Sequence, residues 1–277
     1  MPGRGMGERL AVDPNDGDIL FLGTRNGNGL WRSDDAGETW AQVTAFPETG
    51  PYMEDPDDPF NYANTEVGVV WVTFDPSTGT PGAATQTIYV GTAQNGDGLP
   101  SIFRTTDGGD NWEALPGQPV SDVAGNIVTM TGGTTWDMTA LGDDGQPANP
   151  TTGLLPKQGK LDSEGTLYLT YSNWAGPYRG NIGDVWKYVP STETWTRITP
   201  QNTADPWWGY GGLGVDMQHP GTLVVAGVNS WWPDGVMFRT TDGGATWLPL
   251  WEWGAYPEII AHFDMDVSSA PWLSLDP

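Results

Sequence analysis

The sequence predicts an all-β chain that folds as a β-propeller, with about four four-stranded blades. Its 24 prolines and 39 glycines are spread along all 277 residues, which indicates many turns between short strands. A nonapeptide also recurs, as "RSDDAGETW" at 32–40, "RTTDGGDNW" at 104–112 and "RTTDGGATW" at 239–247. A repeated unit of four short strands is the blade of a propeller.

Each unit begins with a predicted hairpin. Runs of Val, Ile, Leu and Tyr flank a turn rich in Gly, Asn and Asp in "LAVDPNDGDILFLGT", "WVTFDPSTGTPGAATQTIYVGT" and "LGVDMQHPGTLVVAG". A loop, a third strand and the nonapeptide follow. A fourth strand, such as "AQVTAF" or "LPLWEW", closes the unit.

A fourth unit is degraded but recognisable. "GTLYLTYSN" and "DVWKYVPSTETWTRITP" keep Thr194 and Trp195 but lose the turn Asp and Gly. We therefore expect residues 1–277 to form one partial propeller domain, with blades at about 7–46, 66–118, 123–200 and 206–253. A further blade is expected to start at 257–277.

The parts of the nonapeptide suit a hairpin turn. We expect its Asp (Asp35, Asp107, Asp242) to accept hydrogen bonds from its own turn, its Gly (Gly37, Gly109, Gly244) to adopt positive φ, and its Trp to pack between neighbouring sheets. The alternative is that these aspartates are catalytic or bind calcium. It is disfavoured because a catalytic carboxylate is needed once or twice, not once per blade, and because the acidic clusters "DPNDGD" and "EDPDDP" do not have calcium-loop spacing.

Charge and composition limit the classes of partner that the chain is expected to bind. A formal charge of -24 disfavours nucleic acid and anionic membranes, whereas a neutral polysaccharide meets no such repulsion, and 16 Trp and 9 Tyr supply faces that stack on sugar rings. The chain has no cysteine and no apolar run of membrane-spanning length. His219 and His262 have no neighbouring ligand pattern, so we expect no metal, and no cofactor motif is present.

The candidate glycan contacts are aromatic residues in expected loops: Trp231 and Trp232, Trp174 and Tyr178, and Trp207, Trp208 and Tyr210. Trp231 and Trp232 are adjacent, so both cannot lie on one buried face of a strand. Packing between blades or over sheet edges is the alternative for all of them. Asn26 and Asn28 bind sugar hydroxyls or, as Asn-Gly pairs more often do, simply form a turn.

A longer set of phrases carries a family resemblance. The phrases are "GRGMGERLAVDP", "GNGLWRSDDAGETW", "FDPSTGTPGAATQTIYVGTA", "LYLTYSNWAGPY", "GYGGLGVD", "NSWWPDGVMFRTTDGGATW" and "SSAPWL". Over about Gly3 to Trp272, the chain resembles the first propeller of the xyloglucan-specific endo-glucanases of glycoside hydrolase family 74. The nonapeptide resembles the Asp-box of these and other propellers.

The resemblance implies two facing seven-bladed propellers, secretion, and inverting hydrolysis of the β-1,4-glucan backbone of xyloglucan. Inversion requires an acid and a base separated by roughly 6.5–9.5 Å. In that family the base is an Asp in an Arg-Thr-Asp-Ile-Gly-Gly-type segment near the N-terminus of the first propeller, and the acid is an Asp in the second. The chain contains neither segment, so no catalytic residue is assigned to it, and a second propeller is an expected partner.

Two other functional hypotheses are considered. A non-catalytic Asp-box propeller that serves as an interaction or assembly module is the main alternative. A sialidase is disfavoured, because Arg32, Arg104 and Arg239 hold equivalent repeat positions and are expected to be structural. In either case an incomplete propeller exposes strand edges and one sheet face, so we expect poor solubility or self-association.

Overall fold

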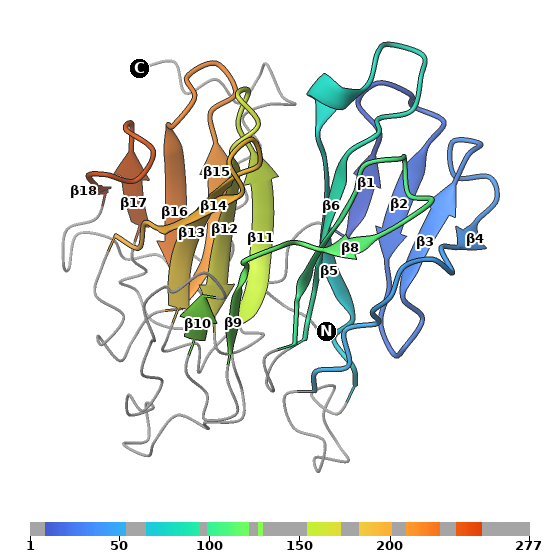
Figure 1. Cartoon of the computed structure of the whole chain (residues 1–277), viewed down its shortest axis with the longest axis horizontal. Coiled ribbons are helices and arrows are strands. Elements are labelled where there is room, and N and C mark those ends of the chain that lie inside the picture. The colour runs from blue at the N-terminus through green and yellow to red at the C-terminus, as the bar shows by residue number, and fades with distance from the viewer. Residues whose placement is uncertain are drawn as a thin grey trace.

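The computed structural model describes residues 9–53, 65–94, 99–121, 127–129, 154–172, 183–200, 209–227 and 237–250. These residues form four four-stranded antiparallel sheets, each with its strands in sequence order (Figure 1). The predicted all-β propeller architecture is confirmed. The predicted start of a further blade at 257–277 lies outside the described residues.

The four sheets are the blades. Blade 1 contains β1 (Leu10–Val12), β2 (Leu20–Gly23), β3 (Leu30–Ser33) and β4 (Ala41–Gln42). Blade 2 contains β5 (Val69–Phe74), β6 (Ile88–Thr92), β7 (Ile102–Thr105) and β8 (Glu113–Ala114). Blade 3 contains β11 (Leu155–Leu161), β12 (Leu167–Ser172), β13 (Gly183–Val189) and β14 (Thr194–Arg197). Blade 4 contains β15 (Tyr210–Val215), β16 (Leu223–Gly227), β17 (Met237–Thr240) and β18 (Leu248–Pro249).

Two smaller elements were not predicted from the sequence. A 3-10 helix, η2 (Pro76–Thr78), follows β5 and begins at Asp75, whose carboxylate accepts the backbone N–H of Ser77. A two-stranded hairpin of β9 (Pro119–Ser121) and β10 (Ile127–Thr129) lies between blades 2 and 3 in the chain. Within the described ranges, no helix has the length and hydropathy needed to cross a bilayer.

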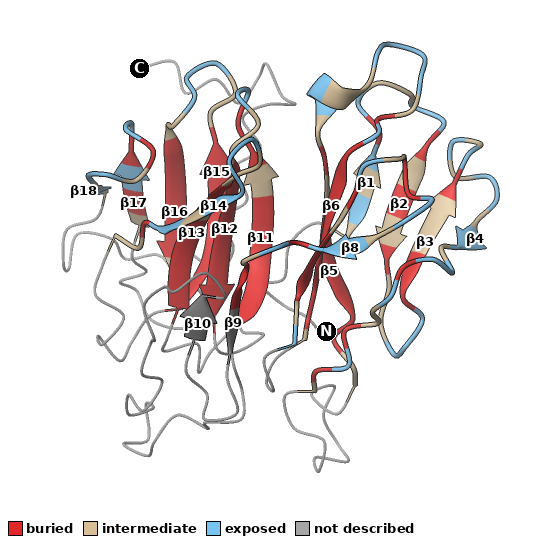
Figure 2. Ribbon diagram, in the orientation of Figure 1, coloured by how far each residue is buried: buried red, intermediate tan, exposed pale blue. Residues whose placement is uncertain are grey.

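The hydrophobic core lies between the blades rather than inside one of them. One cluster joins blades 1 and 2 around Phe21 and Phe103, a second joins blades 2 and 3 around Trp71 and Tyr188, and a third joins blades 3 and 4 around Leu213. Strands β11, β12, β15 and β16 are accordingly buried on both faces (Figure 2). Each blade therefore depends on its neighbour for its stability.

The first strands of blades 2, 3 and 4 share an irregularity that the sequence did not reveal. Their pairing with the second strand shifts between Val69 and Trp71, between Pro156 and Gln158, and between Tyr210 and Gly212. In each case one extra residue is accommodated near the start of the strand, as in a β-bulge. The bulge thus recurs at the same place in three successive blades.

Candidate functional site

Each blade has two ends, which carry different connections. The turn between the third and fourth strands holds the Asp-box in blades 1, 2 and 4, and it lies at the same end as the turn between the first and second strands. We call this the box end; it is at the top of Figure 1. The opposite end, the loop end, carries the connections between the second and third strands and those that lead to the next blade, because the strands are antiparallel and in order.

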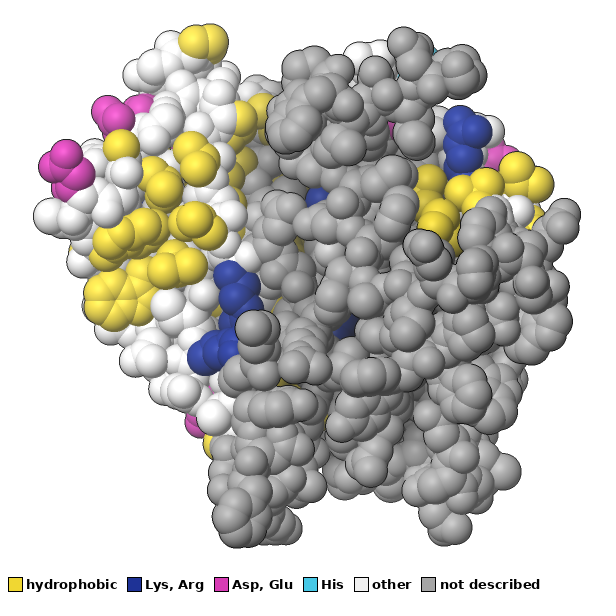
Figure 3. Space-filling model, turned by 180° about the vertical axis from the view of Figure 1, so that it is seen from behind, with side chains coloured by type: hydrophobic (Ala, Val, Ile, Leu, Met, Phe, Trp, Pro, Cys, Tyr) yellow, Lys and Arg dark blue, Asp and Glu magenta, His cyan; other side chains and the backbone are white. Residues whose placement is uncertain are grey.

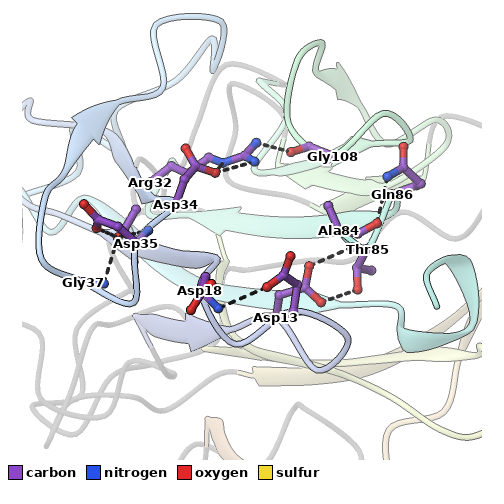
Figure 4. Close-up of polar contacts among 12 residues, drawn as sticks. Asp13, Asp18, Arg32, Asp34, Asp35, Gly37, Ala84, Thr85, Gln86 and Gly108 are labelled. Carbon is purple, nitrogen blue, oxygen red and sulfur yellow. Dashed lines mark hydrogen bonds and ion pairs between the residues drawn. The ribbon is translucent and has the colours of Figure 1, made fainter. Parts of the chain in front are cut away.

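At the box end, the predicted role of the Asp-box is confirmed. Asp35 accepts the backbone N–H of Thr39 over 2.8 Å and the hydroxyl of Ser33 over 2.7 Å, and Gly37 has a φ of 91° (Figure 4). Asp107 and Asp242 make the same bonds in their own turns. These bonds stabilise the ionised carboxylate, and they lower the pKa of Asp107 and of Asp242 to about 2. The three carboxylates are therefore occupied in holding turns.

Three of the four repeat tryptophans pack against the preceding blade, as expected, whereas Trp40 of blade 1 donates to the carbonyl oxygen of Gly37 in its own turn. The ring of Trp112 in blade 2 meets Phe46 of blade 1 edge to face, with 5.1 Å between ring centroids. Trp195 of blade 3 donates its indole N–H to the carbonyl oxygen of Pro116 over 2.8 Å, and Trp247 of blade 4 donates to that of Ile198 over 2.7 Å. The box end is thus a set of clamps between blades.

Six of the seven predicted glycan contacts fall in sequence segments that follow or precede strand ends of the loop end. Trp174 and Tyr178 are in the connection between β12 and β13, Trp207 and Trp208 precede β15, and Trp231 and Trp232 are in the connection between β16 and β17. All six lie outside the described residues. The strand ends that flank them are all at the loop end of blades 3 and 4, so the topology assigns the three segments to one end of the molecule.

Tyr210, the seventh candidate, is described. It is the first residue of β15, only 2% of its surface is exposed, and it belongs to the core cluster of Val185 and Leu213 between blades 3 and 4. In this structure the residue therefore has the packing role that was its alternative interpretation. A contact between Tyr210 and a sugar stays a prediction.

Asn26 and Asn28 form a turn at the loop end of blade 1. Asn26 has a φ of 54°, and the side-chain amide of Asn28 donates to the carbonyl oxygen of Arg25 over 2.7 Å. The same Asn28 offers its own carbonyl oxygen to the indole N–H of Trp31. The side chain of Asn28 is therefore used within the turn, whereas that of Asn26 is exposed and makes no hydrogen bond within the described part of the chain.

A buried carboxylate that sequence reasoning missed lies near the loop end of blade 3. Asp184, the second residue of β13, is fully buried and accepts the guanidinium Nε of Arg197 at 2.8 Å and the indole N–H of Trp186 at 3.0 Å. Burial raises the pKa of Asp184 to about 7, against the opposing effect of Arg197. The only signal in the sequence was an Asp at the start of an otherwise apolar strand.

Lys157 is a second buried charge that the sequence analysis did not single out. It is the extra residue in the bulge of β11, and none of its surface is exposed. Bulges of this kind often adjoin functional sites. Neither Asp184 nor Lys157 reaches solvent, so neither is offered to a ligand in this structure.

The comparison with known proteins fits this geometry. No family model matches the chain. A xyloglucanase from a Paenibacillus species is 50% identical over 99% of the chain, and one from Acetivibrio thermocellus is 49% identical over the same share. The crystal structure of the GH74 xyloglucanase from Xanthomonas campestris superposes with a TM-score of 0.71 at 30% identity over 95% of the chain. The chain is a homologue of the glycoside hydrolase family 74 xyloglucanases.

This family 74 homologue spans only part of its relatives. It covers 23% of the Paenibacillus protein, 28% of the Acetivibrio protein and 34% of the Xanthomonas chain. Within the described ranges it has no cluster of His, Asp or Glu that could hold a metal ion. His219 instead pairs with Asp216 in its own turn, with 2.8 Å between Nδ1 and Oδ2, and His262 lies outside those ranges.

Proposed function

We propose that this chain is part of the first propeller of a secreted xyloglucan hydrolase, and that its loop end forms one wall of a glucan-binding cleft. The observation that carries the proposal is the similarity to xyloglucanases along almost the whole chain, at 50% identity over 276 residues. The aligned 276 residues include the loop-end connections as well as the strands that hold the blades together.

The aromatic residues support a role in glycan binding. Trp174, Trp207, Trp208, Trp231 and Trp232 all belong to connections at the loop end of blades 3 and 4. Tryptophan faces stack on the C–H faces of sugar rings, and a neutral glucan meets no repulsion from a chain with a charge of -24. We propose the pair Trp231 and Trp232 as the platform on which the glucan backbone rests.

The proposed reaction is an inverting hydrolysis that this chain does not complete alone. One carboxylic acid protonates the leaving oxygen, and one carboxylate removes a proton from the attacking water. The Asp-box carboxylates hold turns at the opposite end, and Asp184 is buried against Arg197. We propose that the chain binds and orients the glucan, and that the two reacting carboxylates come from other segments, one of them in a second propeller that faces it.

Affinity electrophoresis tests the binding role. We expect the 277-residue chain to be retarded in a native gel that contains xyloglucan, and Trp231→Ala/Trp232→Ala to abolish most of the retardation. Removing an aromatic side chain on which a nucleic-acid base stacks costs about 1–3 kcal/mol, and we expect a similar loss for a stacked sugar ring. The double variant should therefore weaken binding by at least tenfold. Trp40→Ala, at the box end, is the matched control and should migrate like the parent chain.

The same gel distinguishes glucan binding from the competing interpretation, a non-catalytic interaction module. A chain that is not retarded by xyloglucan or by any other β-glucan, although circular dichroism shows it to be folded, contradicts the binding role and favours a non-catalytic interaction module. Hydrolysis of xyloglucan by the 277-residue chain alone would contradict the assignment of both catalytic carboxylates to other segments.

A further inference from the structure

Two Asn-Gly pairs, Asn26-Gly27 and Asn28-Gly29, lie in the connection between β2 and β3, at the loop end of blade 1 (Figure 1). In such a pair the glycine has no side chain to keep its backbone nitrogen away from the carboxamide of the asparagine. Attack of that nitrogen on the carboxamide is the first step of deamidation, so the sequence makes both pairs susceptible. The structure gives the two asparagines different surroundings.

Asn28 is held by hydrogen bonds of its side chain and of its main chain. Its side-chain amide donates to the carbonyl oxygen of Arg25 over 2.7 Å, and its backbone N–H donates to the same oxygen over 3.1 Å. Its own carbonyl oxygen accepts the indole N–H of Trp31 over 2.9 Å and the side-chain amide of Gln42 over 3.0 Å. The next residue, Gly29, is buried. The carboxamide of Asn28 must therefore leave its hydrogen bond before it can react.

Asn26 and Gly27 lack these constraints. Both residues are exposed, and neither the carboxamide of Asn26 nor the backbone N–H of Gly27 makes a hydrogen bond among the described residues. The backbone N–H of Asn26 donates to the carbonyl oxygen of Glu66 over 3.3 Å. A Cβ at Gly27 would meet only a carboxylate oxygen of Glu66, at 3.4 Å. The reacting atoms can thus approach each other without breaking a hydrogen bond.

We propose that Asn26 is a site of spontaneous deamidation in the folded chain, and that Asn28 is protected from it. The backbone nitrogen of Gly27 loses its proton to solvent and forms a bond to Cγ of Asn26. The bond between Cγ and Nδ2 then breaks, and Nδ2 takes up a proton and leaves as ammonia. Water opens the resulting cyclic imide at either of its two carbonyl groups, which yields an aspartate or an isoaspartate. Water is the only co-reactant.

Deamidation changes both the charge and the main chain at the loop end. It adds one negative charge to the formal charge of -24, next to Arg25 in the chain. Burial and the neighbouring Arg25 lower the pKa of Arg9 to about 10, so two cations already lie close together here. From behind, the flank of blade 1 shows Lys and Arg side chains toward its loop end, below the hydrophobic ones (Figure 3). The isoaspartate form also lengthens the main chain of the turn by one carbon.

Peptide mass spectrometry tests the proposal on the 277-residue chain, incubated in mildly alkaline buffer and then digested. Trypsin cleaves after Arg25 and Arg32, and the peptide 26–32 contains both asparagines. Fragmentation assigns a gain of one mass unit to Asn26 or to Asn28, and labelling by isoaspartyl methyltransferase detects isoaspartate. We expect Asn26 to deamidate about tenfold faster than Asn28, because the reaction at Asn28 must first break hydrogen bonds that Asn26 lacks.

The same chain unfolded in urea is the matched control. Without the turn, both asparagines are simply followed by glycine, so their rates should become similar. In the folded chain, an Asn28 that reacts as fast as Asn26, or an Asn26 that stays intact, overturns the proposal. Deamidation requires no glucan, so either result leaves the proposed binding role untouched.

Ion-exchange chromatography provides an independent measurement, since each deamidation adds one negative charge. A third pair, Asn95-Gly96, lies outside the described residues, and Asn95→Ser in every chain compared removes its contribution. Asn26→Gly retains a residue that accepts the φ of 54° and removes the carboxamide, so it should abolish the rapid formation of the acidic species. Asn28→Ser should leave that rapid step in place. Equal rates for the Asn26→Gly chain and its parent would contradict the assignment to Asn26.

Discussion

Trp247 of blade 4 donates its indole N–H to the main-chain carbonyl of Ile198 in blade 3, with 2.7 Å between Nε1 and O. The bond crosses an interface whose core consists of apolar side chains, and it adds to the polar contacts that Lys187 makes with Gly243 and Asp162 with Gly221. It therefore fixes how blade 4 sits on blade 3, in addition to the burial that holds the two sheets together.

Replacing this donor while keeping an aromatic ring isolates the bond. We expect Trp247→Phe to lower the free energy of unfolding by about 1–2 kcal/mol, because the carbonyl of Ile198 loses its partner. Trp31→Phe is the control, since the indole of Trp31 bonds within its own turn to exposed Asn28 and should matter by less than about 0.5 kcal/mol. Urea unfolding of both variants measures the difference, and equal losses would contradict the role of the inter-blade bond.

Substitutions at two Asp-box glycines, Gly37 and Gly244, distinguish the cost of backbone strain from the cost of steric crowding between blades. Gly244 has a φ of 85°, and a Cβ there would lie 2.5 Å from Cβ of Ile198 in blade 3. Gly37 has a φ of 91°, but a Cβ there would approach nothing closer than 3.8 Å. Gly37→Ala should thus cost about 1–2 kcal/mol for the left-handed backbone alone.

Gly244→Ala should cost the same strain plus about 1–3 kcal/mol of overpacking. Thermal or urea denaturation of the pair provides the comparison. If the two substitutions destabilised the chain equally, blade 4 would not be held as closely against blade 3 as the structure shows.

The Asp-box carboxylates predict a loss of stability in acid. Hydrogen bonds from Asn111 and Thr105 lower the pKa of Asp107 to about 2, those from Thr246 and Thr240 lower the pKa of Asp242 to about 2, and those from Thr39 and Ser33 lower the pKa of Asp35. The unfolded chain therefore binds these protons first. The stabilisation is complete above about pH 4 and is lost as the pH falls from about 4 toward 2.

Asp107→Asn should remove part of that acid dependence and lower stability at neutral pH. Asp110→Asn is the matched control, because Asp110 is exposed in the same turn and its side chain makes no hydrogen bond within the described residues. Urea unfolding midpoints at several pH values between 2 and 7 give the slope of stability against pH for each variant. An unchanged slope in Asp107→Asn would show that this carboxylate does not hold the turn.

The raised pKa of Asp184 predicts that the free energy of unfolding changes with pH in the opposite direction, and at higher pH, than it does for the Asp-box carboxylates. The pKa of Asp184 is raised from 3.8 to about 7, so between these values the folded chain binds the proton that the unfolded chain has released. Its contribution to stability therefore decreases as the pH rises from about 4 to about 7, by at most about 1.4 kcal/mol per pH unit. Asp184→Asn should flatten the stability profile in this range, as followed by urea unfolding. A profile with the parent slope would exclude Asp184 as its source.

The sequence by itself determined the repeat and what it means for the fold. The Asp-box turns, their glycines with positive φ and the four sheets are all local consequences of the printed residues, since a hairpin is specified by neighbours in the chain. For the same reason the fourth unit was recognisable from Thr194 and Trp195 although its box is degraded. The aromatic glycan contacts stay a prediction, because six of the seven residues lie outside the described part of the chain.

Tertiary structure alone decided what the repeated residues do to one another. That Trp195 bonds Pro116, 79 residues away, and that Arg32 reaches Gly108, 76 residues away, depends on how sheets stack, and spacing along the chain does not encode it. Stacking also buries Asp184 and places Tyr210 in a core rather than on a rim. A hairpin can be read from the sequence because its contacts are local, whereas the direction of the blades and the fate of a buried charge follow only from contacts between distant residues.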